Sequence, residues 1–264
     1  MKNKGTMALL FVLVSFSVVT TLIATYPALF APPIPNQIYS PTTPAADERV
    51  VCIVFDDGWK SQLDAAPILE RYGFSATFAI VTSYVGYPDY MSWKEIASLA
   101  QRGHDIESHT VSHKNLSMVD EATLKAELEG SQQALRLKGY AGNILVYPYG
   151  AGSDNATVQA MVAQYYLAAR GTIEGKCNMT TFDRYNINAY DVYHSVEMTD
   201  FAAYLNGTGG SNVAVLYYHK ISVADEETAV SPEMFQAQMQ YLQDNGYTVQ
   251  TLCGLLLKEA PQID

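Results

Sequence analysis

The chain has 264 residues, of which 48% are hydrophobic and 16% are charged, so it holds enough apolar side chains to bury the core of one globular domain. Its 27 acidic residues outnumber its 16 lysines and arginines, which gives a formal net charge of −11 at pH 7. This charge repels the phosphates of nucleic acids and of anionic membranes. It excludes nucleic acid as a partner and favours a neutral polymer.

The N-terminal part has the pattern of an export signal. Lys2 and Lys4 precede an apolar stretch, Met7–Phe30, that contains no charged residue. We therefore predict a signal peptide or membrane anchor over residues 1–30; the length of the stretch favours the anchor, and small residues near its end leave cleavage open. Prolines predict an extended linker over residues 31–47. We expect an extracellular or cell-surface protein, held at the membrane by this segment if it is not cleaved.

From residue 48 onwards, short apolar runs alternate with helical patterns, which is typical of β-α units with parallel strands. Strands are predicted at Val50–Phe55, Ala76–Ile80, Asp105–Ser108, Ile144–Tyr147, Tyr166–Ala169, Val213–Tyr218 and Tyr247–Thr251, with a less distinct one near Tyr185–Asn188. Helices are predicted at Ser61–Tyr72, Trp93–Gln101, Glu121–Lys138, Asn155–Gln164 and Pro232–Asp244. We therefore predict an α/β domain over residues 48–264, an irregular (β/α) barrel of seven to eight parallel strands.

Polar residues stand where these strands end, which is the catalytic end of such barrels. Asp56 and Asp57 follow the first strand, His109 and His113 follow the third, and His219 follows the sixth. Two histidines four residues apart can bind one cation, and a carboxylate completes the set with positions left for water and substrate. The second aspartate can then accept a proton from the water. Each motif alone is as readily a surface histidine pair or a tight turn, but together they predict a hydrolytic metal site.

These motifs resemble those of the polysaccharide deacetylase family, carbohydrate esterases that include chitin, chitooligosaccharide and peptidoglycan N-acetylglucosamine deacetylases. The resemblance covers Val50 to Leu257. It rests on four segments: Phe55–Gly58, Ser108–His113, Tyr147–Gly150 and Leu216–His219. The first two segments together are specific for the family, and the later two support the resemblance only when the first two are present.

The resemblance implies one divalent cation, usually zinc, bound by Asp57, His109 and His113. It implies that Asp56 is the general base that activates the attacking water. It also implies that His219 is the general acid that protonates the departing sugar amine. The substrate would be an N-acetylated oligosaccharide or polysaccharide, similar to chitin, poly-N-acetylglucosamine or cell-wall polymer, and the products would be acetate and a free amino sugar.

The resemblance also implies substrate contacts in the later segments. Tyr149 would donate its backbone N–H to the oxyanion of the tetrahedral intermediate, and Pro148 beside it is also predicted to bind the substrate. Leu216 would help to line the pocket for the acetyl methyl group.

The chain departs from the family pattern at one position. Many members carry an arginine two residues before the proline of the third segment, where it braces the catalytic aspartate, and this chain has Val146 there. Arg184 is expected to take over this catalytic role, because some branches of the family carry an arginine at that place. Asp191 is a weaker candidate for a partner that orients His219.

Two other functions suit the same residues. The first is hydrolysis of a small amide on the same barrel. The second is a catalytically inactive surface module that binds carbohydrate. Aromatic side chains expected near the opening favour a sugar, since flat rings stack on pyranoses: Trp59, Tyr84, Tyr87, Tyr90 and Trp93.

Overall fold

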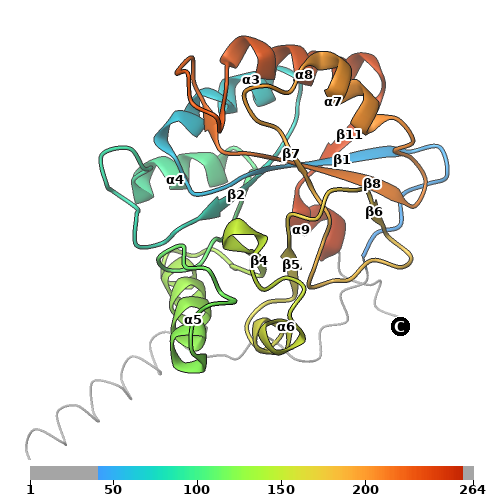
Figure 1. Ribbon diagram of the computed structural model, residues 1–264. Coiled ribbons are helices and arrows are strands. Elements are labelled where there is room, and N and C mark those ends of the chain that lie inside the picture. Colours follow the sequence, from blue (N-terminus) through green and yellow to red (C-terminus); the bar gives the residue numbers. More distant parts are fainter. Residues whose placement is uncertain (1–40, 258–264) are drawn as a thin grey trace, which may run out of the picture. The chain divides into compact units, whose positions relative to one another are not determined.

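The computed structural model describes residues 41–257, so the predicted anchor or signal and most of the predicted linker lie outside the described residues. Within residues 41–257, no helix is long and apolar enough to cross a membrane. The described chain is an α/β domain built on a curled, mostly parallel sheet (Figure 1).

The central sheet has the strand order β5-β4-β3-β2-β1-β8-β6, with β11 paired to β1 and β7 paired to β8. Its strands are β1 (Arg49–Phe55), β2 (Thr77–Ile80), β3 (Asp105–Ser108), β4 (Ile144–Val146), β5 (Ala168–Arg170), β6 (Cys177–Asn178), β7 (Tyr190–Asp191), β8 (Asn212–Tyr218) and β11 (Tyr247–Gln250). Only β6 runs antiparallel to its neighbour. Two short strands, β9 (Lys220–Ile221) and β10 (Ala229–Val230), pair separately. The seven clearly predicted strands are confirmed to within two residues at each end.

The less distinct predicted strand lies between the two edges of the curled sheet. Ile187 forms a parallel bridge with Arg170 at the end of β5. Three residues later, Tyr190 and Asp191 pair with Leu216 and Tyr217 of β8. The chain from 187 to 191 therefore links the β5 edge to β8 through very short pairings, which explains why its sequence pattern is weak.

Helices and 3-10 turns connect the strands: η1 (Lys60–Asp64), α3 (Ala66–Arg71), α4 (Trp93–Gln101), α5 (Glu121–Leu137), η2 (Pro148–Gly150), α6 (Ala156–Val162), α7 (Met198–Leu205), α8 (Pro232–Asp244) and α9 (Leu252–Leu256). Five helices begin with a side-chain N-cap: α4, α5, α6, α8 and α9. In each, an oxygen of the cap side chain accepts a hydrogen bond from a backbone N–H of the first turn, which stabilises the start of the helix. The short helices α7 and α9 were not predicted.

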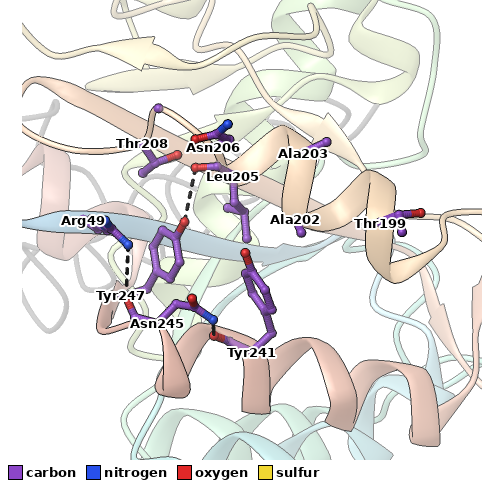
Figure 2. A pocket seen from close by; sticks show the side chains of 11 residues that line it. Arg49, Thr199, Ala202, Ala203, Leu205, Asn206, Thr208, Tyr241, Asn245 and Tyr247 are labelled. Atoms are coloured by element: carbon purple, nitrogen blue, oxygen red, sulfur yellow. Dashed lines mark hydrogen bonds between the residues drawn. The ribbon is translucent and has the colours of Figure 1, made fainter.

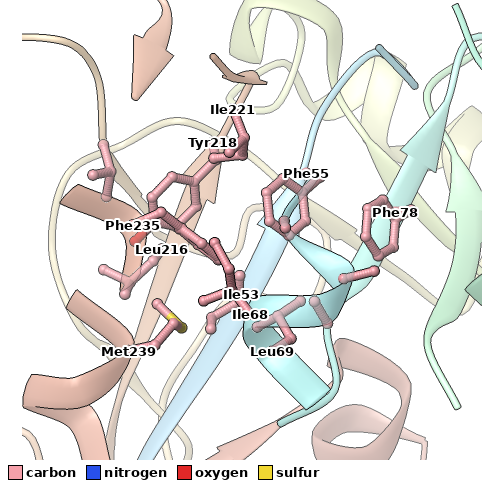
Figure 3. Close-up of a cluster of buried hydrophobic side chains, with 14 of the residues drawn as sticks. Ile53, Phe55, Ile68, Leu69, Phe78, Leu216, Tyr218, Ile221, Phe235 and Met239 are labelled. Atoms are coloured by element: carbon pink, nitrogen blue, oxygen red, sulfur yellow. The ribbon is translucent and has the colours of Figure 1, made fainter. Parts of the chain in front are cut away.

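Strand β1 is buried on both faces, and its residues alternate between two clusters. Ile53 and Phe55 pack outward against α3 and α8, together with Phe78 and Tyr218 (Figure 3). The alternate residues, such as Cys52, face inward and pack with leucines of α9. Because both faces of β1 are covered, its sequence is a continuous apolar run, and the strand ends are the places where polar groups emerge.

Leu69 on α3 tests this packing. It is completely buried in the outer cluster, whereas Leu137 at the end of α5 is 62% exposed. Leu69→Ala should lower the free energy of unfolding by about 2–5 kcal/mol, because it leaves a cavity. Leu137→Ala, the matched control, should change it by about 0.5 kcal/mol or less. Denaturant unfolding measures both, and equal effects would contradict the packing described.

Candidate metal and catalytic site

A cavity of about 420 Å³ opens where the parallel strands end. It is lined by Asp56, Asp57, Trp59, His109, His113, Tyr147, Tyr149, Thr172, Asp191, Tyr217, His219, Lys220 and Thr228. The predicted residues after β1, β3, β4 and β8 therefore meet around one opening.

Three of these side chains form a compact group that can hold a metal ion. Asp57 Oδ1 lies 3.3 Å from His109 Nε2 and 3.1 Å from His113 Nε2. The two Nε2 atoms are 3.1 Å apart. Ligands at about 2.0–2.1 Å from a tetrahedral cation stand roughly 3.3 Å from each other. The predicted ligand set thus has the spacing of a one-cation site, with nitrogen and oxygen donors that suit zinc.

Contacts behind the ligands orient them. His109 Nδ1 is 2.7 Å from the carbonyl oxygen of Val146, so Nδ1 carries the proton and Nε2 keeps its lone pair for a cation. The Trp59 indole N–H donates to Asp57 Oδ2 at 2.7 Å, which leaves Oδ1 facing the histidines. In Asp57 and His109, therefore, one atom is held and the other is free for a cation, as a metal site requires.

The backbone of the site adopts an uncommon conformation. The non-glycine residues with positive φ in the described part are Asp57 (75°), Thr110 (66°), His113 (58°) and Tyr149 (59°), and three of them line the cavity. Such a conformation costs of order 1–3 kcal/mol for each residue. The Thr110 hydroxyl supports the turn by accepting from the His113 backbone N–H at 3.0 Å. The left-handed turns aim Asp57 and His113 at the same point.

Burial and hydrogen bonding act in opposite directions on Asp57. Burial raises the pKa of this carboxyl, but hydrogen bonds from His109 and His113 outweigh it and hold the pKa well below its usual range. Asp57 is therefore an anion at neutral pH, as a metal ligand must be.

Asp56, the predicted base, is buried and paired with Arg170. Arg170 Nη2 donates to both carboxylate oxygens, to Oδ1 at 2.5 Å. The guanidinium is itself completely buried and lies 4.4 Å above the centre of the Tyr217 ring. Asp56 is thus held in one orientation by a cation at the end of β5.

The prediction that Arg184 braces Asp56 is wrong. Arg184 Nη1 donates to the carbonyl oxygen of Leu167 at 3.3 Å, just before β5, so its guanidinium lies at the opposite end of that strand from Arg170. Arg170 is also the β5 partner of Val146 in the parallel register. The missing arginine of the third segment is therefore replaced from the neighbouring strand, at the paired position.

His219 also lines the cavity, directly after β8. Its Nδ1 is 3.9 Å from Asp191 Oδ1. The two residues expected to pair therefore face each other, but this distance is longer than a hydrogen bond. Burial raises the pKa of the Asp191 carboxyl, and the charge of His219 acts against this rise. Asp191, on β7, faces Nδ1 of the imidazole, so Nε2 is the nitrogen that can contact a substrate.

Two of the three predicted substrate contacts are placed differently by the structure. Tyr149 lines the cavity; the residue is 68% exposed, and its ring centre lies 4.6 Å from that of His113. Pro148 is buried at the start of η2 and is not among the lining residues. The prediction for Leu216 is wrong, because this side chain faces the outer cluster (Figure 3) and strand alternation places Tyr217 in the cavity instead.

Trp59 supports the site, and its indole ring contacts two neighbouring side chains. Tyr90 stacks on it with ring centres 4.3 Å apart, and the Lys220 ammonium lies 4.2 Å from the centre of the indole ring. Among the aromatic residues that line the cavity, Tyr149 is the one with a largely exposed side chain.

A larger cavity, of about 640 Å³, lies away from this chemistry (Figure 2). It is bordered by α7, α8 and Arg49 at the first residue of β1. Its lining residues include no carboxylate, histidine or cysteine. Its polar groups serve the fold: Arg49 donates to the Asn245 carbonyl at 3.3 Å, and the Tyr247 hydroxyl donates to the Leu205 carbonyl at 3.2 Å.

The sequence model of the polysaccharide deacetylase family matches residues 43–168, which contain the three candidate ligands and Asp56. This match covers just under half of the chain. A Bacillus cereus peptidoglycan-N-acetylglucosamine deacetylase is 31% identical over 111 residues, which are 40% of this chain and 38% of that protein. A gellan lyase from Bacillus is 34% identical over 124 residues, 46% of this chain and 5% of that protein. The chain thus spans less than half the length of either relative.

The fold extends beyond the matched segment. A family 4 carbohydrate esterase from Streptomyces lividans, solved in complex with acetate, aligns with a TM-score of 0.58 and 17% identity over 81% of this chain and all of that one. At this identity the likeness shows the fold. Arg170, Asp191 and His219 lie beyond residue 168, so their placement at the site is known from geometry alone.

Sequence reasoning missed Arg170, Tyr217 and the supporting role of Trp59. Arg170 carries the signal that identified Asp56, a charged residue directly after an apolar strand. Tyr217 is two residues before His219 and so shares its face of β8. The contact from Trp59 to Asp57 has no sequence signal beyond proximity.

His109 provides the test of the metal site. We expect the purified protein to bind about one divalent cation and His109→Ala to lose at least about 100-fold in zinc affinity, measured by competition with a chelating dye. His194→Ala is the matched control, because that histidine is half exposed and pairs with Asp225 away from the cavity. Unchanged affinity in His109→Ala would rule out the proposed ligand set.

Arg170 provides the test of the buried ion pair. Arg170→Met leaves the Asp56 carboxylate buried without a partner, so it should lower the free energy of unfolding by about 3–5 kcal/mol at pH 7. Adding Asp56→Asn removes the uncompensated charge and should restore a large part of this loss. Denaturant unfolding of the single and double variants measures both. A double variant no more stable than Arg170→Met would mean that the charge on Asp56 is not what Arg170 compensates.

Proposed function

We propose that this protein hydrolyses N-acetyl groups of a carbohydrate, releasing acetate and a free amino sugar. The observation that supports this most directly is the convergence of the group formed by Asp57, His109 and His113 with the Asp56–Arg170 pair at one cavity. The family of residues 43–168 and the N-acetylated substrate named for the Bacillus cereus relative point to the same reaction.

One divalent cation, with zinc as the proposed ion, would act at this site as a Lewis acid and lower the pKa of a bound water. The remaining steps fall to side chains of the chain itself. Asp56 accepts a proton as water attacks the acetyl carbonyl carbon, and Arg170 holds that carboxylate in one orientation. The C–N bond then breaks, and His219 donates a proton to the departing amine.

Other groups at the opening position the substrate. Tyr149 presents its backbone beside the ligands in a left-handed turn, where its N–H would stabilise the oxyanion, and its exposed ring offers a face for a pyranose. Tyr217, which the cavity includes in place of Leu216, would contact the acetyl methyl group.

Acetate release is the test. We expect it from chitooligosaccharides, poly-N-acetylglucosamine or peptidoglycan, and not from acetamide; acetylated xylan tests whether O-acetyl esters are also used. Asp56→Asn should keep the metal and lose about 10²–10⁴ in kcat, because an amide cannot accept the proton.

His219→Ala should lose more on an N-acetyl amide than on an aryl acetate, whose leaving group needs less protonation. Activity on acetamide alone would favour a small-amide hydrolase. Binding to sugar without acetate release by a metal-loaded protein would favour an inactive carbohydrate-binding module, and either result would overturn the proposal.

A further inference from the structure

The strands that deliver the base and the acid stop pairing just before these residues. Strands β1 and β8 are in parallel register up to Phe55 and Tyr218, and the Asp56 N–H still donates to the Tyr218 carbonyl at 2.9 Å. At Asp57 the backbone turns into the left-handed region with φ of 75°. The strand ladder therefore ends at the two residues whose separation matters most to the proposed reaction.

Gln62 supplies donors at this point. Its side-chain Nε2 lies 2.5 Å from the carbonyl oxygen of Asp56 and 2.7 Å from that of His219. An amide –NH₂ has two hydrogens, so each carbonyl receives one. The reverse orientation of the amide would direct its oxygen at two carbonyl oxygens, so these partners determine the assignment.

The place of Gln62 makes this contact rigid. The side chain is completely buried, and the residue sits in η1, where its own N–H donates to the Trp59 carbonyl at 3.1 Å. Gln62 is not one of the residues that line the cavity. Its side-chain amide can therefore act on the reaction through the backbone of Asp56 and His219.

We propose that Gln62 is a positioning residue that replaces the missing strand hydrogen bonds and thereby sets the separation of Asp56 and His219 across the cavity. This inference rests on the proposed function, in which one residue accepts a proton and the other donates one. Reactions of this kind lose about 10²-fold in rate when a group is misplaced by about 1 Å.

Gln62→Met tests the proposal, since it keeps most of the side-chain volume and removes both donors. Gln238→Met is the matched control. Gln238 is also completely buried, and it accepts from the Tyr218 hydroxyl at 2.9 Å without touching the backbone of Asp56 or His219. Gln62→Asn, which withdraws the amide by one methylene group, is the second variant if Gln62→Met does not fold.

We expect Gln62→Met to lower kcat on an N-acetylglucosamine oligomer by about 10²-fold, with KM and zinc affinity changed by about twofold or less. The loss on an aryl acetate should be smaller, because displacement of His219 matters less there. Gln238→Met should keep kcat within about twofold. Hydrogen exchange of the Asp56 amide should become at least about tenfold faster in Gln62→Met and not in Gln238→Met, since the strand ends are no longer tied.

Equal losses of kcat in both glutamine variants, or an unchanged Asp56 exchange rate in Gln62→Met, would overturn the proposal. Wild-type protein that binds metal but releases no acetate would instead overturn the proposed function. In that case the exchange rates would still decide whether Gln62 ties the two strands.

Discussion

The buried pair of Asp56 and Arg170 is the interaction on which the site depends. A buried charge is strongly destabilising unless an opposite charge lies beside it, so neither Asp56 nor Arg170 can be buried without its partner. Asp56 follows β1 and Arg170 ends β5, and three strands separate β1 from β5 in the sheet. A flat sheet would keep these residues far apart. The curl of the sheet brings them together across its interior.

The same curl lets distant segments support each ligand. His109, after β3, is oriented by the carbonyl of Val146 on β4, and Asp57 is oriented by the indole of Trp59. The positive φ angles of Asp57 and His113 add a second constraint, because they turn these side chains towards one point at a cost in backbone energy. The packed strands beneath supply the stability that allows this conformation to persist.

The residues that line the cavity come from two parts of the chain. The metal-ligand group and Tyr149 follow β1, β3 and β4, and His219 follows β8, with Asp191 on neighbouring β7. The family match ends at residue 168, so it covers the first part and stops short of the second. The ligands, the base and the acid could be predicted from motifs, whereas Arg170, which braces the base, required the structure.

The sequence by itself determined the strand pattern and the residues at the strand ends, because both are local. Apolar runs mark β1 and β8, and Asp56, Asp57 and His219 come directly after these runs, while His109 and His113 come within five residues of the end of β3. Strand alternation also indicates Tyr217 rather than Leu216 as the cavity residue, because Tyr217 is two residues before His219 and so lies on the same face of the strand. Only the tertiary structure decided that Arg170 and not Arg184 reaches Asp56, and that Gln62 lies between β1 and β8. These contacts depend on the register of β4 with β5 and on how far the sheet curls, which are sums of many packing interactions and leave no mark on any single segment.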